Sequence, residues 1–152
     1  MGLFTSINIA STGLAAERLK SDVISNNIAN ASTTRTQEGG PFKRSSVIFE
    51  PVASKNPTWR SPYLPENLDN GAGQGVKVRE IIKDTSRGTL IFDPNHPDAI
   101  KSGPEKGYVE YPNVNIVNEM VDLIASSRAY EANTTVIEGA KSMFAAALDI
   151  GR

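Results

Sequence analysis

The sequence predicts an α+β fold that is mainly α-helical, with long N- and C-terminal helices paired as an antiparallel coiled coil and a small β-rich, irregular insert between them. The distribution of proline supports this prediction, because all nine prolines of the 152-residue chain lie between Pro41 and Pro112. Proline interrupts a helix, so only the two ends can form long ones. Apolar residues also recur in steps of three and four at both ends, which is typical of amphipathic helices.

The N-terminal helix is predicted over residues 4–31. Alternating steps of four and three from Leu3 reach eight positions, of which six are apolar. An average spacing of about 3.5 residues is that of helices that supercoil around each other. Gly13 is a mild weakness in the middle, since glycine lowers helix propensity. The pattern ends in VISNNIANASTT (residues 23–34), whose asparagines favour caps and turns.

The C-terminal helix is predicted over residues 116–149, with Asn115 as its N-cap and Pro112 preventing an earlier start. The same steps from Ile116 reach ten positions, seven of them apolar or aromatic. A second face would offer more apolar surface than one partner helix can cover. That second face consists of Ala125, Ala129, Ala132, Val136, Ala140, Met143 and Ala147.

These stripes supply the candidate site residues. The intervening insert returns the chain, so the simplest pairing of the two helices is antiparallel. The apolar positions are expected to pack either within one chain, as an ordinary core, or between chains in an assembly. These candidates are Leu14, Ile24, Ile28, Ile116, Leu123, Tyr130, Ile137 and Phe144, with Ala132 and Val136 on the second face. A buried polar residue at a helix seam fixes register, and the candidates for that role are Asn26, Asn27, Asn30 and Asn133.

The insert contains four short β-like runs that could form one small antiparallel sheet. Residues 53–75, rich in proline and glycine, are expected to form a long loop. The expected organisation is therefore a discontinuous helical assembly domain, residues 1–35 and 113–152, and a β-rich outer domain, residues 36–112. The four runs are residues 46–49, 76–82, 89–92 and 108–111.

Composition excludes several classes of function. With 16 Lys+Arg against 17 Asp+Glu, no net positive field is present to attract nucleic acid or an acidic membrane surface. The absence of cysteine rules out disulfides, thiol catalysis and cysteine-bearing zinc sites. No apolar run is long enough to cross a bilayer or to serve as the core of a secretory signal peptide. We therefore expect no cofactor, no metal, no nucleic acid and no direct membrane insertion.

Two motifs in the insert resemble functional sites, but both fit structural roles better. The glycines of residues 71–75 precede a strand pattern rather than a helix, unlike a phosphate loop. The sequence DPNHPD (residues 93–98) contains the only histidine, and its two prolines favour a rigid turn. An enzyme is disfavoured.

The alternative function is that of a periplasmic hydrolase or peptidoglycan-acting module that uses acidic residues of the insert. Its candidate pairs are Glu66 with Asp69 and Asp93 with Asp98.

Several segments of the chain match motifs of one known protein family. At the N-terminal end these are STGLAA (11–16) and VISNNIAN (23–30). Further along they are FDPNHPDA (92–99), GYVEYPNVN (107–115), EMVDLI (119–124) and SRAYEAN (127–133). Together these segments resemble the bacterial flagellar basal-body rod protein family, and within it the proximal rod subunits. The resemblance covers nearly the whole chain.

The resemblance implies a self-assembling structural subunit whose function is mechanical. Such a subunit would transmit torque through the periplasmic rod, with the terminal helices forming an inner tube and the middle segment an outer domain. Its partners would be itself, other rod subunits and the flagellar type III export apparatus. Export by that route leaves no cleaved signal peptide, which agrees with the absence of a signal sequence.

Overall fold

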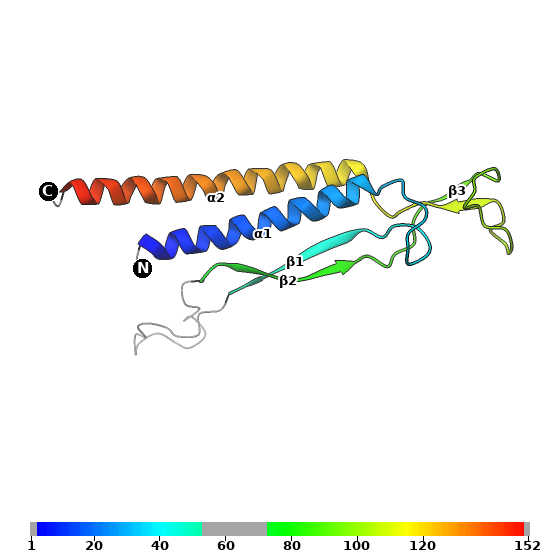
Figure 1. Ribbon diagram of the computed structural model, residues 1–152, viewed down its shortest axis with the longest axis horizontal. Coiled ribbons are helices and arrows are strands. Elements are labelled where there is room, and N and C mark those ends of the chain that lie inside the picture. The colour runs from blue at the N-terminus through cyan, green and yellow to red at the C-terminus, as the bar shows by residue number, and fades with distance from the viewer. Residues whose placement is uncertain (1–2, 53–72, 151–152) are drawn as a thin grey trace, which may run out of the picture. The chain divides into compact units, whose positions relative to one another are not determined.

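The computed structural model describes residues 3–52 and 73–150, and it contains two long helices with four short strands between them (Figure 1). This arrangement confirms the predicted α+β, mainly helical fold. Most of the predicted 53–75 loop lies outside the described residues, as do Glu66 and Asp69. In chain order the elements are α1 (Leu3–Ala29), β1 (Ser45–Pro51), β2 (Val76–Lys83), β3 (Leu90–Phe92), β4 (Tyr108–Glu110) and α2 (Ile116–Ile150).

The chain divides into two compact units, and each combines segments from both helices and from the insert. Unit 1 consists of Met1–Arg18, Ile48–Glu80 and Arg128–Arg152. Unit 2 consists of Leu19–Val47 and Ile81–Ser127. Because neither unit is continuous in sequence, each depends on contacts between residues that are far apart along the chain.

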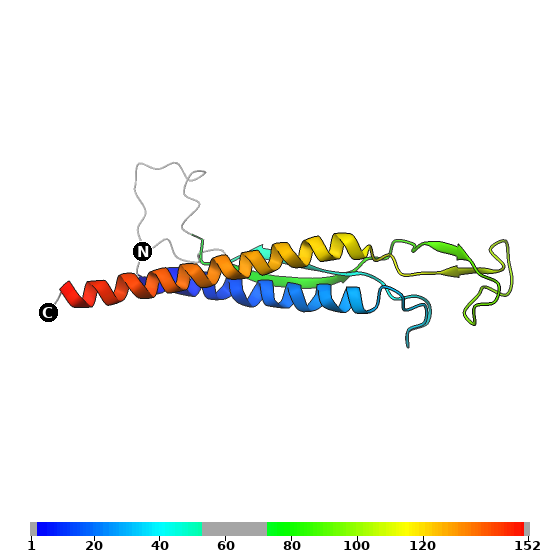
Figure 2. The ribbon, with the colours of Figure 1, turned by 90° about the horizontal axis from the view of Figure 1, so that it is seen from above.

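In unit 1 the helix segments lie side by side and antiparallel (Figure 2). Phe4, near the start of α1, contacts Phe144, near the end of α2, with ring centroids 6.1 Å apart. The helices meet through small residues, since Ala10, Ala16 and Ala140 are all buried. Small side chains let two helix backbones come close together, so this contact has little room for large residues.

Gly13 has a packing role that its helix propensity does not reveal. A Cβ atom at this position would lie 2.9 Å from Nδ2 of Asn133 on α2. The amide of Asn133 is itself fixed, because Nδ2 donates to the carbonyl oxygen of Ala129 at 3.0 Å. The low helix propensity of Gly13 is therefore accompanied by a packing role, because the missing side chain makes room for Asn133.

The start of β2 is bonded to α1 within the same unit. The hydroxyl of Thr12 donates to the carbonyl of Ile9 at 2.7 Å and accepts from the backbone N–H of Val76 at 3.2 Å. Gly75 precedes that contact with φ of +110°, and a side chain there would collide with the Thr12 hydroxyl. One threonine thus anchors the second strand of the insert to the first helix.

Unit 2 contains the antiparallel pair β3 and β4, in which Ile91 lies opposite Val109. Val109 is almost fully buried, and the rings of Phe92 and Tyr108 meet edge to face at 5.2 Å. The predicted turn at residues 93–98 is confirmed by hydrogen bonds from the backbone N–H of His96 to the Asp93 carbonyl and from that of Asn95 to the Asp93 carboxylate.

The four strands form two separate two-stranded sheets, β1 with β2 and β3 with β4, so the expectation of one small sheet is wrong. The chain changes partner between β2 and β3. The N–H of Asp84 still bonds to the carbonyl of Arg44 beside β1, whereas the carbonyl of Thr89 already accepts from Tyr111 beside β4. Ser86 lies between them and is held by the side chain of Asn113.

The N-terminus of α2 is capped as predicted. Oδ1 of Asn115 accepts from the backbone N–H groups of Val117 at 3.0 Å and Asn118 at 3.4 Å. These bonds satisfy donors that the first turn of a helix cannot satisfy by itself. The cap fixes where α2 begins and therefore which of its residues face α1.

Replacing Gly13 by alanine is expected to destabilise the protein, although alanine is normally the better helix former. The gain in propensity is about 1 kcal/mol, whereas forcing a side chain into a filled contact costs roughly 1–3 kcal/mol. Gly139→Ala is the matched control, because Gly139 is on α2 with open space around it. Thermal unfolding should show a lower Tm for Gly13→Ala and an equal or higher Tm for Gly139→Ala. Equal stabilisation by both changes would contradict the packing role of Gly13.

Candidate assembly site

A buried carboxylate joins α1, α2 and the start of β1 in unit 2. Glu119, in the first turns of α2, is 1 % exposed, and Asn27, near the end of α1, is 0 % exposed. Nδ2 of Asn27 donates to Oε2 of Glu119 at 3.0 Å, and Nε of Arg44 donates to Oε1 at 2.6 Å. We call Asn27, Arg44, Ser45 and Glu119 the junction cluster.

The amide of Asn27 also pairs with the backbone of Ser45. Its Nδ2 donates to the Ser45 carbonyl at 2.8 Å, and its Oδ1 accepts from the Ser45 N–H at 3.0 Å. A carboxamide presents an acceptor oxygen beside an NH2 group with two donors, so it can pair with a backbone as a neighbouring strand would and still donate to Glu119. The last full turns of α1 therefore determine where β1 begins.

Arg44 extends the junction cluster toward the end of the insert. Its guanidinium lies 3.5 Å from the carboxylate of Asp122, one turn after Glu119. Its backbone N–H donates to Oδ1 of Asn113 at 2.9 Å, and its carbonyl accepts from Asp84 at 2.7 Å. The residue thus connects both ends of the insert to α2.

A second polar contact lies along the same helix pair. The hydroxyl oxygens of Ser21 and Ser126 are 3.0 Å apart, and Ser126 is almost fully buried. Since Ser21 is less than two turns from Asn27, and Ser126 is two turns from Glu119, both contacts specify the same antiparallel register. Sliding one helix along the other would break these polar contacts between the helices, and losing a buried hydrogen bond is costly.

The opposite side of α2 in unit 2 is apolar and exposed. Val117, Met120, Val121 and Ile124 form this exposed α2 patch, and each has between 55 % and 68 % of its surface accessible. Their spacing of three and four places them on one side of the helix, and at 100° per residue that side lies opposite Glu119 and Ser126. Contiguous exposed apolar side chains of this kind mark an interaction surface.

The structure places the sequence-predicted packing residues in two classes. Those that lie within the chain are Ile24, which is buried, and Leu14, Ile28, Leu123 and Ile137, which are half-buried. Those on the surface are Ile116, Tyr130, Ala132, Val136 and Phe144. The predicted set is therefore divided between residues packed within the chain and residues that stay exposed among those the structure describes.

The four predicted polar residues are also divided. Asn27 and Asn133 lie between the helices. Asn30, the residue after α1, bonds back to that helix, since its Nδ2 donates to the carbonyl and to Oδ1 of Asn26 at 2.9 and 3.0 Å. Asn26 and Asn30 therefore bond to each other at the end of α1. Asn27 and Asn133, in contrast, contact the partner helix or the insert.

Periodicity alone missed Arg44, Glu119 and Ser126. The apolar stripe of α2 favours Met120 at the seam, but the buried residue lies one position earlier. The signal that could have revealed this is a seven-residue recurrence of polar or small residues: Glu119, Ser126, Asn133 and Ala140. These are the residues that a close helix contact can hold, and the larger apolar ones are left outside.

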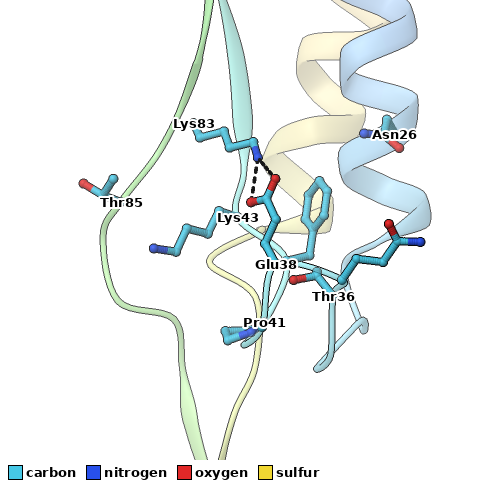
Figure 3. Close-up of a pocket in the computed structure, with 10 residues that line it drawn as sticks. Asn26, Thr36, Glu38, Pro41, Lys43, Lys83 and Thr85 are labelled. Carbon is cyan, nitrogen blue, oxygen red and sulfur yellow. Dashed lines mark hydrogen bonds and ion pairs between the residues drawn. The ribbon is translucent and has the colours of Figure 1, made fainter.

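Figure 3 shows an open cavity of about 860 Å³ near the end of α1, where Asn26 is one of the lining residues. Glu38 and Lys83 point toward each other there, with both carboxylate oxygens 2.9 Å from Nζ. The hydrogen bond and charge of Lys83 hold the pKa of Glu38 below its usual value. Both side chains are exposed, so this ion pair contributes little to stability.

The described residues show neither a metal-binding cluster nor a membrane-spanning helix. Among residues 3–52 and 73–150, no three His, Asp or Glu side chains gather closely enough to hold a metal ion. No helix in the described part of the chain has the length and apolar character needed to span a membrane. Every buried side-chain nitrogen or oxygen there has a hydrogen-bond partner. The site thus combines a fixed polar contact on one side of α2 with an exposed apolar surface on the opposite side.

A double-mutant cycle on Arg44 and Glu119 should show strong coupling. Breaking a buried ion pair from one side costs about 3–5 kcal/mol when the other charge stays buried, and the partial exposure of Arg44 lowers this figure. Urea unfolding of Arg44→Ala, Glu119→Ala and the double variant would measure it. The control is the exposed pair Arg128 and Glu131, for which about 0.5 kcal/mol or less is expected. A coupling no larger than that of the control would contradict the junction cluster's importance.

Both ends of the chain match known protein families. Residues 7–36 match the family described as flagella basal body rod protein, and residues 105–150 match flagellar basal body rod FlgEFG protein C-terminal. The flagellar basal-body rod protein FlgC of Borreliella burgdorferi is 63% identical over 99% of this chain and 98% of its own. That of Bacillus subtilis is 40% identical and that of Salmonella typhimurium 32% identical, each over the full length of both chains. The chain belongs to the FlgC family of flagellar basal-body rod proteins.

Proposed function

We propose that this chain is a structural subunit of the proximal rod, which assembles through its terminal helices with itself and with other rod subunits to transmit torque across the periplasm. Membership of the FlgC family supports the coarser part of this statement, a non-enzymatic rod subunit of the flagellar basal body. The observation that carries the finer part is the exposed α2 patch.

The patch is energetically unfavourable in an isolated chain. Burying a Val-, Ile- or Met-sized side chain stabilises by about 1.5–3 kcal/mol, so its four residues represent a large potential gain. A helix side that faces away from its partner within the chain can be covered only by another molecule or another segment. A neighbouring subunit fits this requirement because a rod is built from repeated contacts of this kind.

We further propose that the surface residues of the predicted packing set act between subunits. Ile116, Tyr130 and Phe144 are between 41 % and 46 % exposed, and Val136 is 50 % exposed. Ile116 is an exposed apolar residue of α2 in unit 2, and the other three are exposed apolar residues of α2 in unit 1. In this proposal the assembly domain comprises residues 1–35 and 113–152, and residues 36–112 form the outer domain.

The junction cluster also supports the proposal that the subunit transmits torque. A load applied to the helices reaches the insert through short hydrogen bonds with Glu119 and Asn27 rather than through a flexible linker. We propose that Asn27 and Asn133 fix the register of the helix pair, and that Asn26 and Asn30 end the first helix where the insert begins.

Export completes the proposal. Partners would include the flagellar type III export apparatus, and the chain would reach the periplasmic rod without a cleaved signal peptide. The hydrolase alternative has no such support. Asp93 accepts from the Asn95 N–H and Asp98 accepts from the Thr34 hydroxyl at 2.8 Å, so both carboxylates stabilise local structure.

Charge substitutions in the patch should abolish assembly without unfolding the chain. Val121→Lys and Ile124→Lys place an ammonium group in a surface that is already accessible, so Tm should change by little. Rod formation should fail, because a buried unpaired charge is strongly unfavourable at an interface. Swimming of a strain that carries only the variant gene, and electron microscopy of its basal bodies, would measure this.

Ser25→Lys, an exposed position on α1, is the control and should leave swimming intact. Ala132→Lys and Val136→Lys test the second face of α2 in the same way. Normal rods in every patch variant would overturn the proposal that α2 provides the interface.

A further inference from the structure

A cavity of about 440 Å³ lies at the link between β3 and β4 in unit 2. Its walls include Phe92, Ile100 and the backbone of Gly107, and its rim carries Lys101 and Lys106. We call this the tip cavity. The ring of Phe92 is 62 % exposed beside it, so an apolar hollow and an accessible aromatic side chain form one surface.

The backbone around the tip cavity is held by several hydrogen bonds. The N–H of Gly107 donates to the carbonyl of Ile100, and the N–H of Ile100 donates to that of Tyr108, both at 2.9 Å. Gly107 has φ of +84°, and a side chain there would lie 2.9 Å from the ring of Phe92. The hollow is thus part of the folded structure, and its floor requires glycine.

The tip cavity carries two lysine side chains. Lys101 and Lys106 are both exposed, and neither forms an ion pair with any residue that the structure describes. In contrast, nearby Arg87 forms an ion pair with Glu105. Two exposed ammonium groups beside an apolar hollow suit a partner that presents carboxylates next to small or apolar side chains.

One face of α2 in unit 1 has that chemistry. Glu138 and Asp149 are exposed and form no ion pair within residues 3–52 and 73–150. They are eleven residues apart, which is about three helical turns and about 16 Å along the same side of the helix. Between them on that side lie Ser142 and Ala145, both small and exposed. Lys141 points about 60° away at 100° per residue.

We propose that the tip cavity of one copy of this chain receives the acidic face of α2 of a second copy. Lys101 and Lys106 would pair with Glu138 and Asp149, and Phe92 would rest on the small residues between the two acids. The two surfaces differ, so the contact is head to tail and leaves each copy with one free surface of each kind. Such contacts generate an open helical assembly when the rotation between neighbours does not close into a ring. The inference rests on the proposed function, because it adds a contact to the same rod.

Sedimentation velocity on the full-length chain tests this contact with two charge-reversed variants. The tip variant carries Lys101→Glu and Lys106→Glu, and the helix variant carries Glu138→Lys and Asp149→Lys. In each variant alone the two surfaces have the same sign of charge, so self-association should weaken roughly tenfold or more. An equimolar mixture should associate again, as should a chain that carries all four changes.

Two controls separate this contact from general charge effects and from the α2 patch. Lys20→Glu with Lys43→Glu changes net charge equally at positions outside the tip and should leave association unchanged. Val121→Lys with Ile124→Lys reports on the proposed function. Association that falls with the patch variant but not with the tip variant would overturn the tip contact while the proposed function stands.

Three further results would also overturn the tip contact. The first is a wild-type chain that stays monomeric at every concentration reached. The second is an equimolar mixture of the two charge-reversed variants that associates no more strongly than either variant alone, and the third is association that does not weaken with added salt. The last criterion follows because exposed ion pairs are screened within about 8–10 Å at moderate ionic strength.

Discussion

The burial of one carboxylate constrains much of unit 2. Glu119 is out of contact with water, so its charge must be met by fixed partners, and the chain supplies them from α1 and from the residue before β1. Because Asn27 also bonds to the backbone of Ser45, the same few atoms determine helix register and the start of the insert. An uncompensated buried charge would be expensive, so alternative registers are disfavoured.

The close contact between the helices determines which side chains of α2 remain exposed. In unit 1 it is made by alanines and by Gly13 against Asn133, and in unit 2 it includes two serine hydroxyls. Small residues bury little apolar area, so the pair gains less from the hydrophobic effect than a leucine-rich coiled coil would. Several large apolar side chains of α2, such as Val117 and Ile124, thereby stay exposed among the described residues. This distribution suits a subunit whose stability is completed by assembly.

Much of this architecture could be predicted from local patterns. Proline placement located the helices to within a few residues, and Asn115 was recognisable as a cap because its role depends only on its immediate neighbours. The seam of α2 was less predictable. Periodicity favoured Met120 over Glu119, because it ranks apolar residues highest and cannot detect a partner such as Arg44, which is 75 residues away in the chain. The packing role of Gly13 could not be predicted for the same reason, since it depends on Asn133.

The sequence by itself determined the order and type of the elements, the absence of cysteine chemistry and the resemblance to flagellar rod proteins. These follow from propensity, composition and short motifs, which are properties of neighbouring residues. Only the tertiary structure decided which side of α2 faces α1, that the strands form two sheets, and that Asn27, Arg44 and Glu119 meet. Those outcomes depend on distances between residues far apart in the chain, where a shift of one position changes which side chain is buried.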